Sequence, residues 1–206
     1  MTDYNKIYTG ISKAIWGYFF LYLNFTINIG NGSISLLPSF VGYILFLKAI
    51  DLLKDEEQEL SLLRTLGIVL AVWNVAEWFA DCIAYNFGGK WQFVTLITGL
   101  VNLYFHFQFI TNLASIATKH QQENCIYDKD LLTCRTVQTI LQTFFLIVSN
   151  LNYNFSFAPD EVGFYATIIL TLCYFIFLLG IVRTLVQLRK HLKSDGDFED
   201  EIVTTE

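Results

Sequence analysis

Long apolar stretches alternate with short polar ones along most of the chain. A helix needs about 20 mostly apolar residues to cross the hydrocarbon core of a bilayer. Six stretches come near that length, and they predict an all-α, polytopic transmembrane helical bundle over residues 1–193. The expected spans are 11–29, 38–53, 65–85, 91–117, 136–155 and 162–188. An acidic tail, residues 194–206, follows them and is expected to be disordered.

The composition agrees with a membrane protein. Hydrophobic residues make up 54% of the 206 positions and charged residues only 16%, whereas a soluble domain carries about 25% charged residues. The net charge of −6 comes largely from the acidic tail. Because no basic surface is expected, a nucleic-acid partner is not predicted, and the expected partners are membrane lipids.

The positive charges predict the orientation of the bundle. In a six-span arrangement, twelve of the 13 Lys and Arg residues fall on one side, and only Lys90 falls on the other. The twelve are Lys6, Lys13, Lys48, Lys54, Arg64, Lys119, Lys129, Arg135, Arg183, Arg189, Lys190 and Lys193. Because loops on the cytoplasmic side of a membrane are rich in Lys and Arg, we expect a cell-membrane protein with both termini in the cytoplasm.

A short motif occurs twice. Residues 38–43 read Pro-Ser-Phe-Val-Gly-Tyr at the start of the second span, and residues 159–164 read Pro-Asp-Glu-Val-Gly-Phe at the start of the sixth. Proline suits the first position of a helix, and the glycine allows a neighbouring backbone to come close. The repeated motif indicates either a parallel repeat of two hairpins or a general preference for Pro and Gly where a helix re-enters the membrane.

The sequence around the first copy resembles a known pattern. Asn28-Ile-Gly30, followed by Leu37-Pro-Ser-Phe-Val-Gly-Tyr43, is similar to a family of small, uncharacterised bacterial membrane proteins, in which Asp usually stands where this chain has Ser39. The resemblance covers the first two spans and implies no activity.

Ionisable side chains inside a membrane are costly, and each is a functional candidate by default. The third span carries Asn74, Glu77 and Asp81 within one sector of the helix, with Trp78 beside them. Two carboxylates four residues apart repel each other, so one needs a raised pKa or a cationic partner. We therefore expect this face to point into the bundle or into a water-filled vestibule, and not toward lipid.

The fourth and fifth spans carry further polar side chains. Thr95, Asn102 and His106 lie on one face of the fourth span, and Gln138 and Gln142 lie four residues apart in the fifth. These residues either line a cavity together with Glu77, or form hydrogen bonds that hold helices to one another. No spacing predicts a metal site, and no cofactor is expected.

Three classes of function fit this pattern. The first is a transporter or solute-binding membrane subunit for a small solute or ion, similar in architecture to the substrate-binding subunits of energy-coupling-factor transporters. Gly10, Ala14 and Gly17 form a partial small-residue stripe like that of those subunits. The second is an assembly or regulatory protein that binds a protein partner or a second copy. The third, an enzyme using Glu77 and Asp81 as acid and base, ranks last because the sequence has no catalytic motif.

Overall fold

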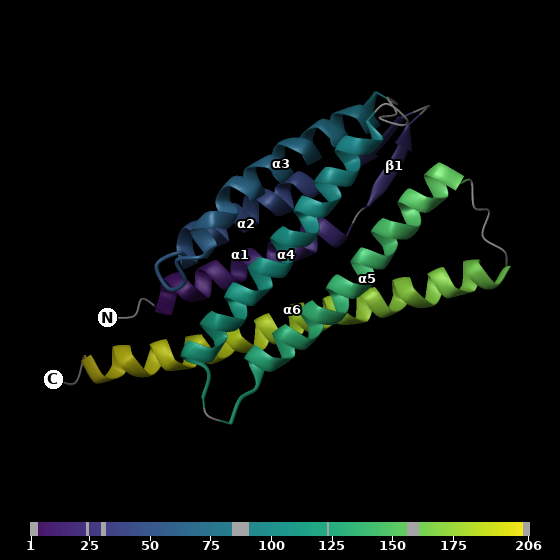
Figure 1. Ribbon diagram of the computed structural model, residues 1–206. Helices are drawn as coiled ribbons and strands as arrows, with labels where there is room; N and C mark the ends of the chain where they lie inside the picture. The colour runs from purple at the N-terminus through teal and green to yellow at the C-terminus, as the bar shows by residue number, and fades with distance from the viewer. Residues whose placement is uncertain are drawn as a thin grey trace.

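Figure 1 shows the computed structural model of the protein, which describes residues 4–23, 25–29, 32–83, 91–122, 124–155 and 161–203. Six α-helices make up most of these residues, as the sequence predicts. They are α1 (Tyr4–Tyr22), α2 (Ser39–Leu53), α3 (Leu60–Cys82), α4 (Gln92–His120), α5 (Tyr127–Phe155) and α6 (Glu161–Val203). A small β-hairpin, β1 (Thr26–Ile29) and β2 (Gly32–Ser35), lies between α1 and α2.

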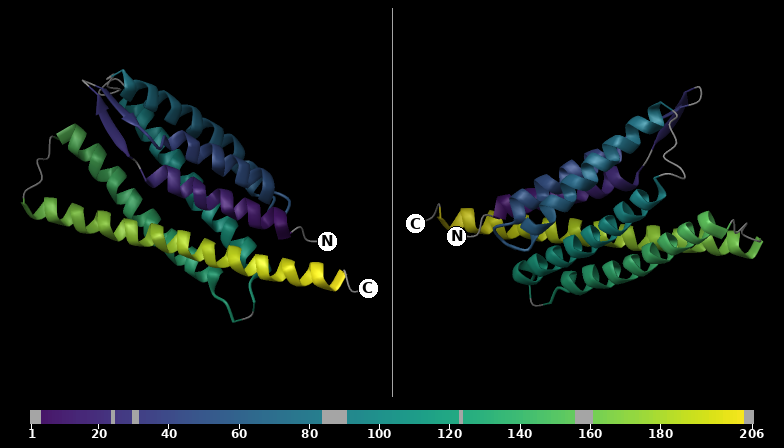
Figure 2. Two further views of the ribbon diagram at one scale, coloured as in Figure 1. Left: turned by 180° about the vertical axis from the view of Figure 1, so that it is seen from behind. Right: turned by 45° about the horizontal axis from the view of Figure 1, so that its top comes forward.

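The helices pack in the order of the sequence. Each helix contacts the next one, and α6 returns to contact α1, so the six form a closed ring. Figures 1 and 2 show that α1 begins and α6 ends at the same end of this ring. We call it the basic end, because the helix ends that meet there carry Lys54, Arg64, Lys119 and Lys129; the opposite end, with β1 and β2, is the hairpin end.

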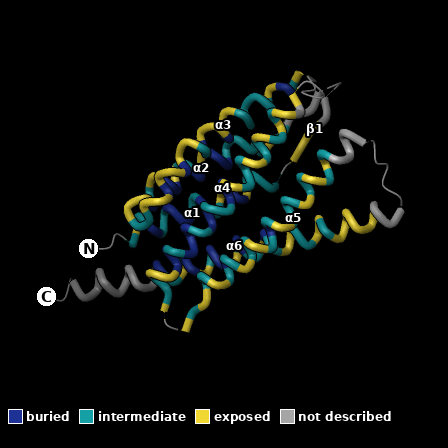
Figure 3. Tube along the Cα trace, viewed as in Figure 1, coloured by how far each residue is buried: buried dark blue, intermediate teal, exposed yellow. Residues whose placement is uncertain are grey.

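Four helices are long and apolar enough to cross a membrane. The stretches that meet this description are Leu60–Cys82, Phe93–His120, Tyr127–Asn150 and Phe164–Leu192. Large apolar side chains on these helices, such as Val72, Phe79, Ile140 and Ile176, are exposed. Figure 3 shows that exposed positions recur along the helices of the bundle. A water-soluble protein rarely exposes apolar surface on this scale, so the exposed faces support a membrane environment.

The predicted first span, residues 11–29, is wrong at its C-terminal end. The helix runs from Tyr4 to Tyr22, and residues Thr26–Ile29 form β1, paired antiparallel with β2 so that Thr26 faces Ser35 and Ile29 faces Gly32. Three of the four residues in Thr-Ile-Asn-Ile are β-branched, which favours a strand. Average hydropathy does not distinguish this strand from the end of a helix.

Other helices extend beyond their predicted ranges. α3 begins at Leu60 and α5 at Tyr127, because a helix that has formed continues into polar flanks at little cost. Asp128 and Asp130 also favour the first turn of α5 through the helix dipole. α6 continues to Val203, so residues 194–203 are helical here and do not form the disordered tail expected from the sequence.

The second copy of the repeated motif lies partly outside the described residues. Pro159 is not described, and the superposition of Pro38 on Pro159 therefore stays a prediction. Pro38 is the N-cap residue of α2 and has an extended backbone, with φ −66° and ψ 132°. It therefore lies one residue before the first helical position, where the sequence placed it.

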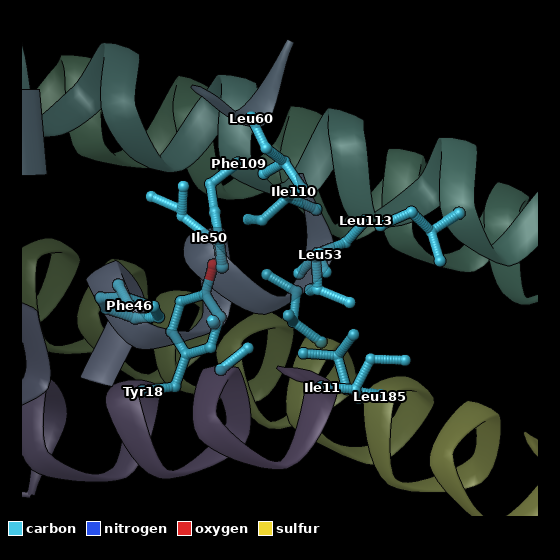
Figure 4. Close-up of a cluster of buried hydrophobic side chains, with 14 of the residues drawn as sticks. Ile11, Tyr18, Phe46, Ile50, Leu53, Leu60, Phe109, Ile110, Leu113 and Leu185 are labelled. Carbon is cyan, nitrogen blue, oxygen red and sulfur yellow. The ribbon is translucent and has the colours of Figure 1, made fainter. Parts of the chain in front are cut away.

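The centre of the ring is densely packed toward the basic end. Phe46, Ile50 and Leu53 of α2 meet Phe109 and Leu113 of α4 there (Figure 4), and all five are fully or almost fully buried. Leu185 and neighbouring residues of α6 close the cluster from the other side. The centre of this half of the bundle is therefore filled by apolar side chains.

Helices α1 and α2 approach very closely. A Cβ placed on Gly42 would lie 2.9 Å from the carbonyl oxygen of Gly17, and one placed on Gly17 would lie 2.8 Å from the Phe46 ring. The role predicted for the motif glycine is thus confirmed for Gly42. The stripe of Gly10, Ala14 and Gly17 is buried within the chain, so it is not a free surface for a partner.

A polar network closes the basic end. The short loop between α2 and α3 carries acidic side chains that contact α1 and α4: Asp55 pairs with Lys6, and Glu57 accepts hydrogen bonds from Ser115 (2.6 Å) and Lys119 (3.2 Å). The Ser115 hydroxyl is the main cause that holds the pKa of Glu57 below its ordinary value of 4.5. This loop therefore ties α1 and α4 to the two helices that it joins, α2 and α3.

Candidate functional site

A polar cavity of about 260 Å³ lies inside the ring, in the half near the hairpin end. Five helices, α1 to α5, contribute to its wall. Its polar lining includes the Glu77 carboxyl group and the amides of Asn74, Asn102 and Gln142. The sequence singled out all four residues, and the structure brings them into one cavity.

The α3 side of the cavity carries its charge. Trp73, Asn74 and Glu77 all line the wall, and Leu70 lies at the deeper end. Trp73 and Glu77 are four residues apart on the helix, and their side chains are hydrogen-bonded. Asn74 donates from Nδ2 to the Leu70 carbonyl oxygen at 2.8 Å, so its side-chain oxygen keeps its acceptor capacity. This face of α3 points into the bundle, as expected.

Two tyrosines line the cavity from α1 and α2, and hydrogen bonds hold both in position. The Tyr43 hydroxyl donates to Oδ1 of Asn102 on α4 at 2.6 Å. The Tyr22 hydroxyl accepts from the Tyr174 hydroxyl on α6 at 2.8 Å. Gln138 on α5 in turn donates to Tyr174 at 3.2 Å. These bonds connect the two tyrosines to α4 and α6, so helices across the bundle hold both side chains in position.

Asp81 and Trp78 do not belong to the cavity wall. Asp81 lies one turn beyond Glu77 and is exposed. Trp78 donates from Nε1 to the carbonyl oxygen of Ser35 at 3.2 Å and packs against Phe40, so it joins α3 to the hairpin and to α2. Of the expected acidic pair, only Glu77 therefore lines the cavity.

His106 lies deeper than the cavity and does not line it. Its side chain is 3% exposed, and neither ring nitrogen has a hydrogen-bond partner. Five aromatic rings surround it at centroid distances of 5.3–6.3 Å, including those of Tyr22 and Tyr43 from the cavity wall. No hydrogen bond of His106 holds helices together, so packing is what places it here.

Some lining residues were not singled out from the sequence. Trp73, Tyr22 and Tyr43 stand among many other aromatic residues, and only contacts between helices select them. The spacing of Trp73 to Glu77, four residues on one helix, was the one available signal. Thr98 also lines the wall and donates its hydroxyl to the Val94 carbonyl of its own helix at 2.9 Å. Thr95, which the sequence did single out, lines the wall as well.

Within the described part of the chain, no group of three or more His, Cys, Asp and Glu side chains is placed to hold a metal ion. No family model, curated protein or solved structure matches this chain. What the cavity does must therefore be argued from its own chemistry.

Proposed function

We propose that all six helices cross the membrane and that both termini lie in the cytoplasm. Two arguments support this topology. α1 and α2 pack in the same ring as the four helices that are long and apolar enough to cross a membrane. Twelve of the 13 Lys and Arg residues fall on the side of the predicted spans that corresponds to the basic end, as the positive-inside rule requires of a cytoplasmic face.

Cysteine accessibility tests this topology. In a cysteine-free chain, single cysteines on the outer side should react with an impermeant thiol reagent added outside intact cells, and those on the inner side should not. The outer positions are Asn31 and Ser156, and the inner positions are Gln58 and Gln122. Labelling of the Gln58 position from outside would disprove the proposed orientation.

We further propose that the protein binds a small solute in its central cavity, as a transporter or as the solute-binding subunit of one. The observation that carries this proposal is the cavity around Glu77, which is lined by residues of five helices, α1 to α5. A carboxyl group set in an apolar bundle is unfavourable unless hydrogen bonds, a ligand, a proton or water compensate it, and Trp73 supplies one such hydrogen bond to Glu77. A pocket with a few convergent polar groups is the usual form of a small-molecule site.

The alternative functions have less support. An assembly or regulatory protein is favoured by the densely packed basic half and by the exposed apolar helix faces, but lipid covers such faces equally well. An acid–base enzyme needs Glu77 to meet a second reactive group. Asp81 is exposed outside the cavity, and His106 is enclosed below it.

Two-sided labelling of the cavity tests the proposal. We expect a single cysteine at Thr98, in the cavity wall, to react with an impermeant thiol reagent, whereas one at Ala114, which is 2% exposed in the core, stays unreactive. A transporter should expose the Thr98 position to the outer side and to the cytoplasmic side in turn, whereas a binding subunit should expose it to the outer side alone. No reaction from either side would contradict a solute cavity.

A further inference from the structure

We propose that the central cavity binds a small organic cation, a compact alkylammonium, with its charge near Glu77 and its alkyl groups against aromatic rings. This inference rests on the proposed solute-binding function and specifies its ligand class. It follows from the charge of the cavity, from the aromatic rings in its wall and from its size.

The charge of the cavity favours a cation. Glu77 is the only acidic side chain in the described lining, and that lining contains no Lys, Arg or His. The ion pairs of the described residues are at the basic end, and none of them involves Glu77. The amide oxygens and threonine hydroxyls in the wall are further acceptors. An anionic solute would meet the carboxylate without a compensating cation, so the wall selects against it.

The aromatic lining favours an organic cation. Tyr22, Tyr43 and Trp73 come from three different helices and line the same cavity as the carboxylate. The face of an aromatic ring carries negative electrostatic potential, and rings grouped around a site are the usual way in which proteins bind quaternary ammonium groups. A metal ion such as Ca²⁺ instead needs six to eight oxygen ligands, and no cluster of acidic and histidine ligands occurs among the described residues.

The rings are held in place before the ligand enters. Tyr43 is bonded to Asn102, and Tyr22 to Tyr174, so the ring positions depend on helices α4 and α6 as well as on their own. A binding site whose side chains are already ordered loses less entropy on binding. Preorganised rings also define the space between them, which makes the site selective for ligand size.

The size of the cavity favours a compact ligand. Its 260 Å³ corresponds to the volume of about nine water molecules, at about 30 Å³ each. Tetramethylammonium and choline fit this volume, whereas a large amphiphile exceeds it. The packed core around Phe46 and Phe109 prevents the ligand from lying deeper in the resting bundle.

Binding to the purified full-length chain in detergent tests this inference. The probes are tetramethylammonium, choline, the neutral carbon isostere dimethylbutanol, K⁺, Ca²⁺ and glutamate, and the readouts are tryptophan fluorescence and thermal unfolding. We expect the two organic cations to bind and to raise Tm, and dimethylbutanol to bind at least about tenfold more weakly, because it lacks the charge.

Variants locate the site. Glu77→Gln should weaken choline binding by at least about tenfold, and Trp73→Leu should weaken it through loss of a ring face. Asp81→Asn is the matched control, because Asp81 is on the same helix but exposed outside the cavity, and it should bind choline as the wild-type chain does.

Four results would overturn the inference. Equal binding of dimethylbutanol and choline would exclude a charge-selective site, and so would unchanged choline binding by Glu77→Gln. Binding of glutamate, Ca²⁺ or K⁺ in place of the organic cations, lost when Thr98→Trp fills the cavity, would overturn the ligand class but keep the solute site. A chain that no probe of any class binds would overturn both the ligand class and the proposed function.

Discussion

Replacing Gly42 by alanine should destabilise the bundle, and the same change at Gly99 should not. At Gly42 the new methyl group would lie 2.9 Å from the Gly17 carbonyl oxygen and 3.2 Å from the Leu21 backbone nitrogen. At Gly99 the nearest atom is the tip of the Leu146 side chain, at 3.3 Å. A side chain can rotate away, but the backbone of α1 moves only if the two helices separate.

The pair of variants isolates this contact. Both glycines are inside helices, so alanine improves helix propensity by about 1 kcal/mol at each, and this gain cancels in the comparison. Overpacking costs about 1–3 kcal/mol, so Gly42→Ala should be less stable than Gly99→Ala by that amount. For a chain of this size, 1 kcal/mol corresponds to about 2–4 °C in Tm.

Thermal unfolding of both variants in the same detergent measures the difference. Equal Tm values would refute the reasoning, because they would mean that α1 and α2 have room for a methyl group. Gly17→Ala provides a further check. Its methyl group would meet the Phe46 ring and no backbone atom, so Phe46→Leu should partly restore its stability, whereas no side-chain change should restore Gly42→Ala.

Three other outcomes are expected. Glu77→Gln should keep or raise the Tm of the ligand-free chain, because it removes a charge from the bundle. Asp81→Asn should change Tm less. A large fall in Tm for Glu77→Gln would show that the carboxylate holds the fold through an ion pair. His106→Phe should leave Tm unchanged or raise it, since both ring nitrogens lack partners, and a clear fall would reveal a bond to His106. The lowered pKa of Glu57 means that its contribution to stability is present above about pH 4.5 and is lost as the pH falls through its folded-state pKa. Ser115→Ala should therefore lower Tm at neutral pH, and this difference should vanish in acid.

The small-residue stripe of α1 has a structural role within the chain. Gly10, Ala14 and Gly17 are spaced for close helix contact, and the structure uses them in that way. Their partner, however, is α2 of the same chain. The stripe therefore no longer supports the comparison with energy-coupling-factor subunits, and the solute-binding proposal rests on the cavity alone.

The number of helices and the candidate polar residues could be predicted from the sequence, because both follow from local properties. Apolar runs of sufficient length predict helices, and Asn74, Glu77 and Asn102 stand out since polar groups are rare in such runs. The ends of the helices could not be predicted, because a helix continues past the apolar run from which it is recognised. The strand β1 was missed for a related reason: its residues are as apolar as those of a helix.

The depth and direction of each polar side chain depended on the tertiary structure. Glu77 and Asp81 share one sector of α3, yet Glu77 lines the cavity while Asp81 is exposed, because the surrounding helices enclose only part of that face. His106 shares a face with Asn102 but lies deeper in the bundle than the cavity, among aromatic rings of α1 and α2. Periodicity gives the angle of a residue around its own helix, whereas burial depends on which neighbours stand opposite, and those come from distant parts of the chain.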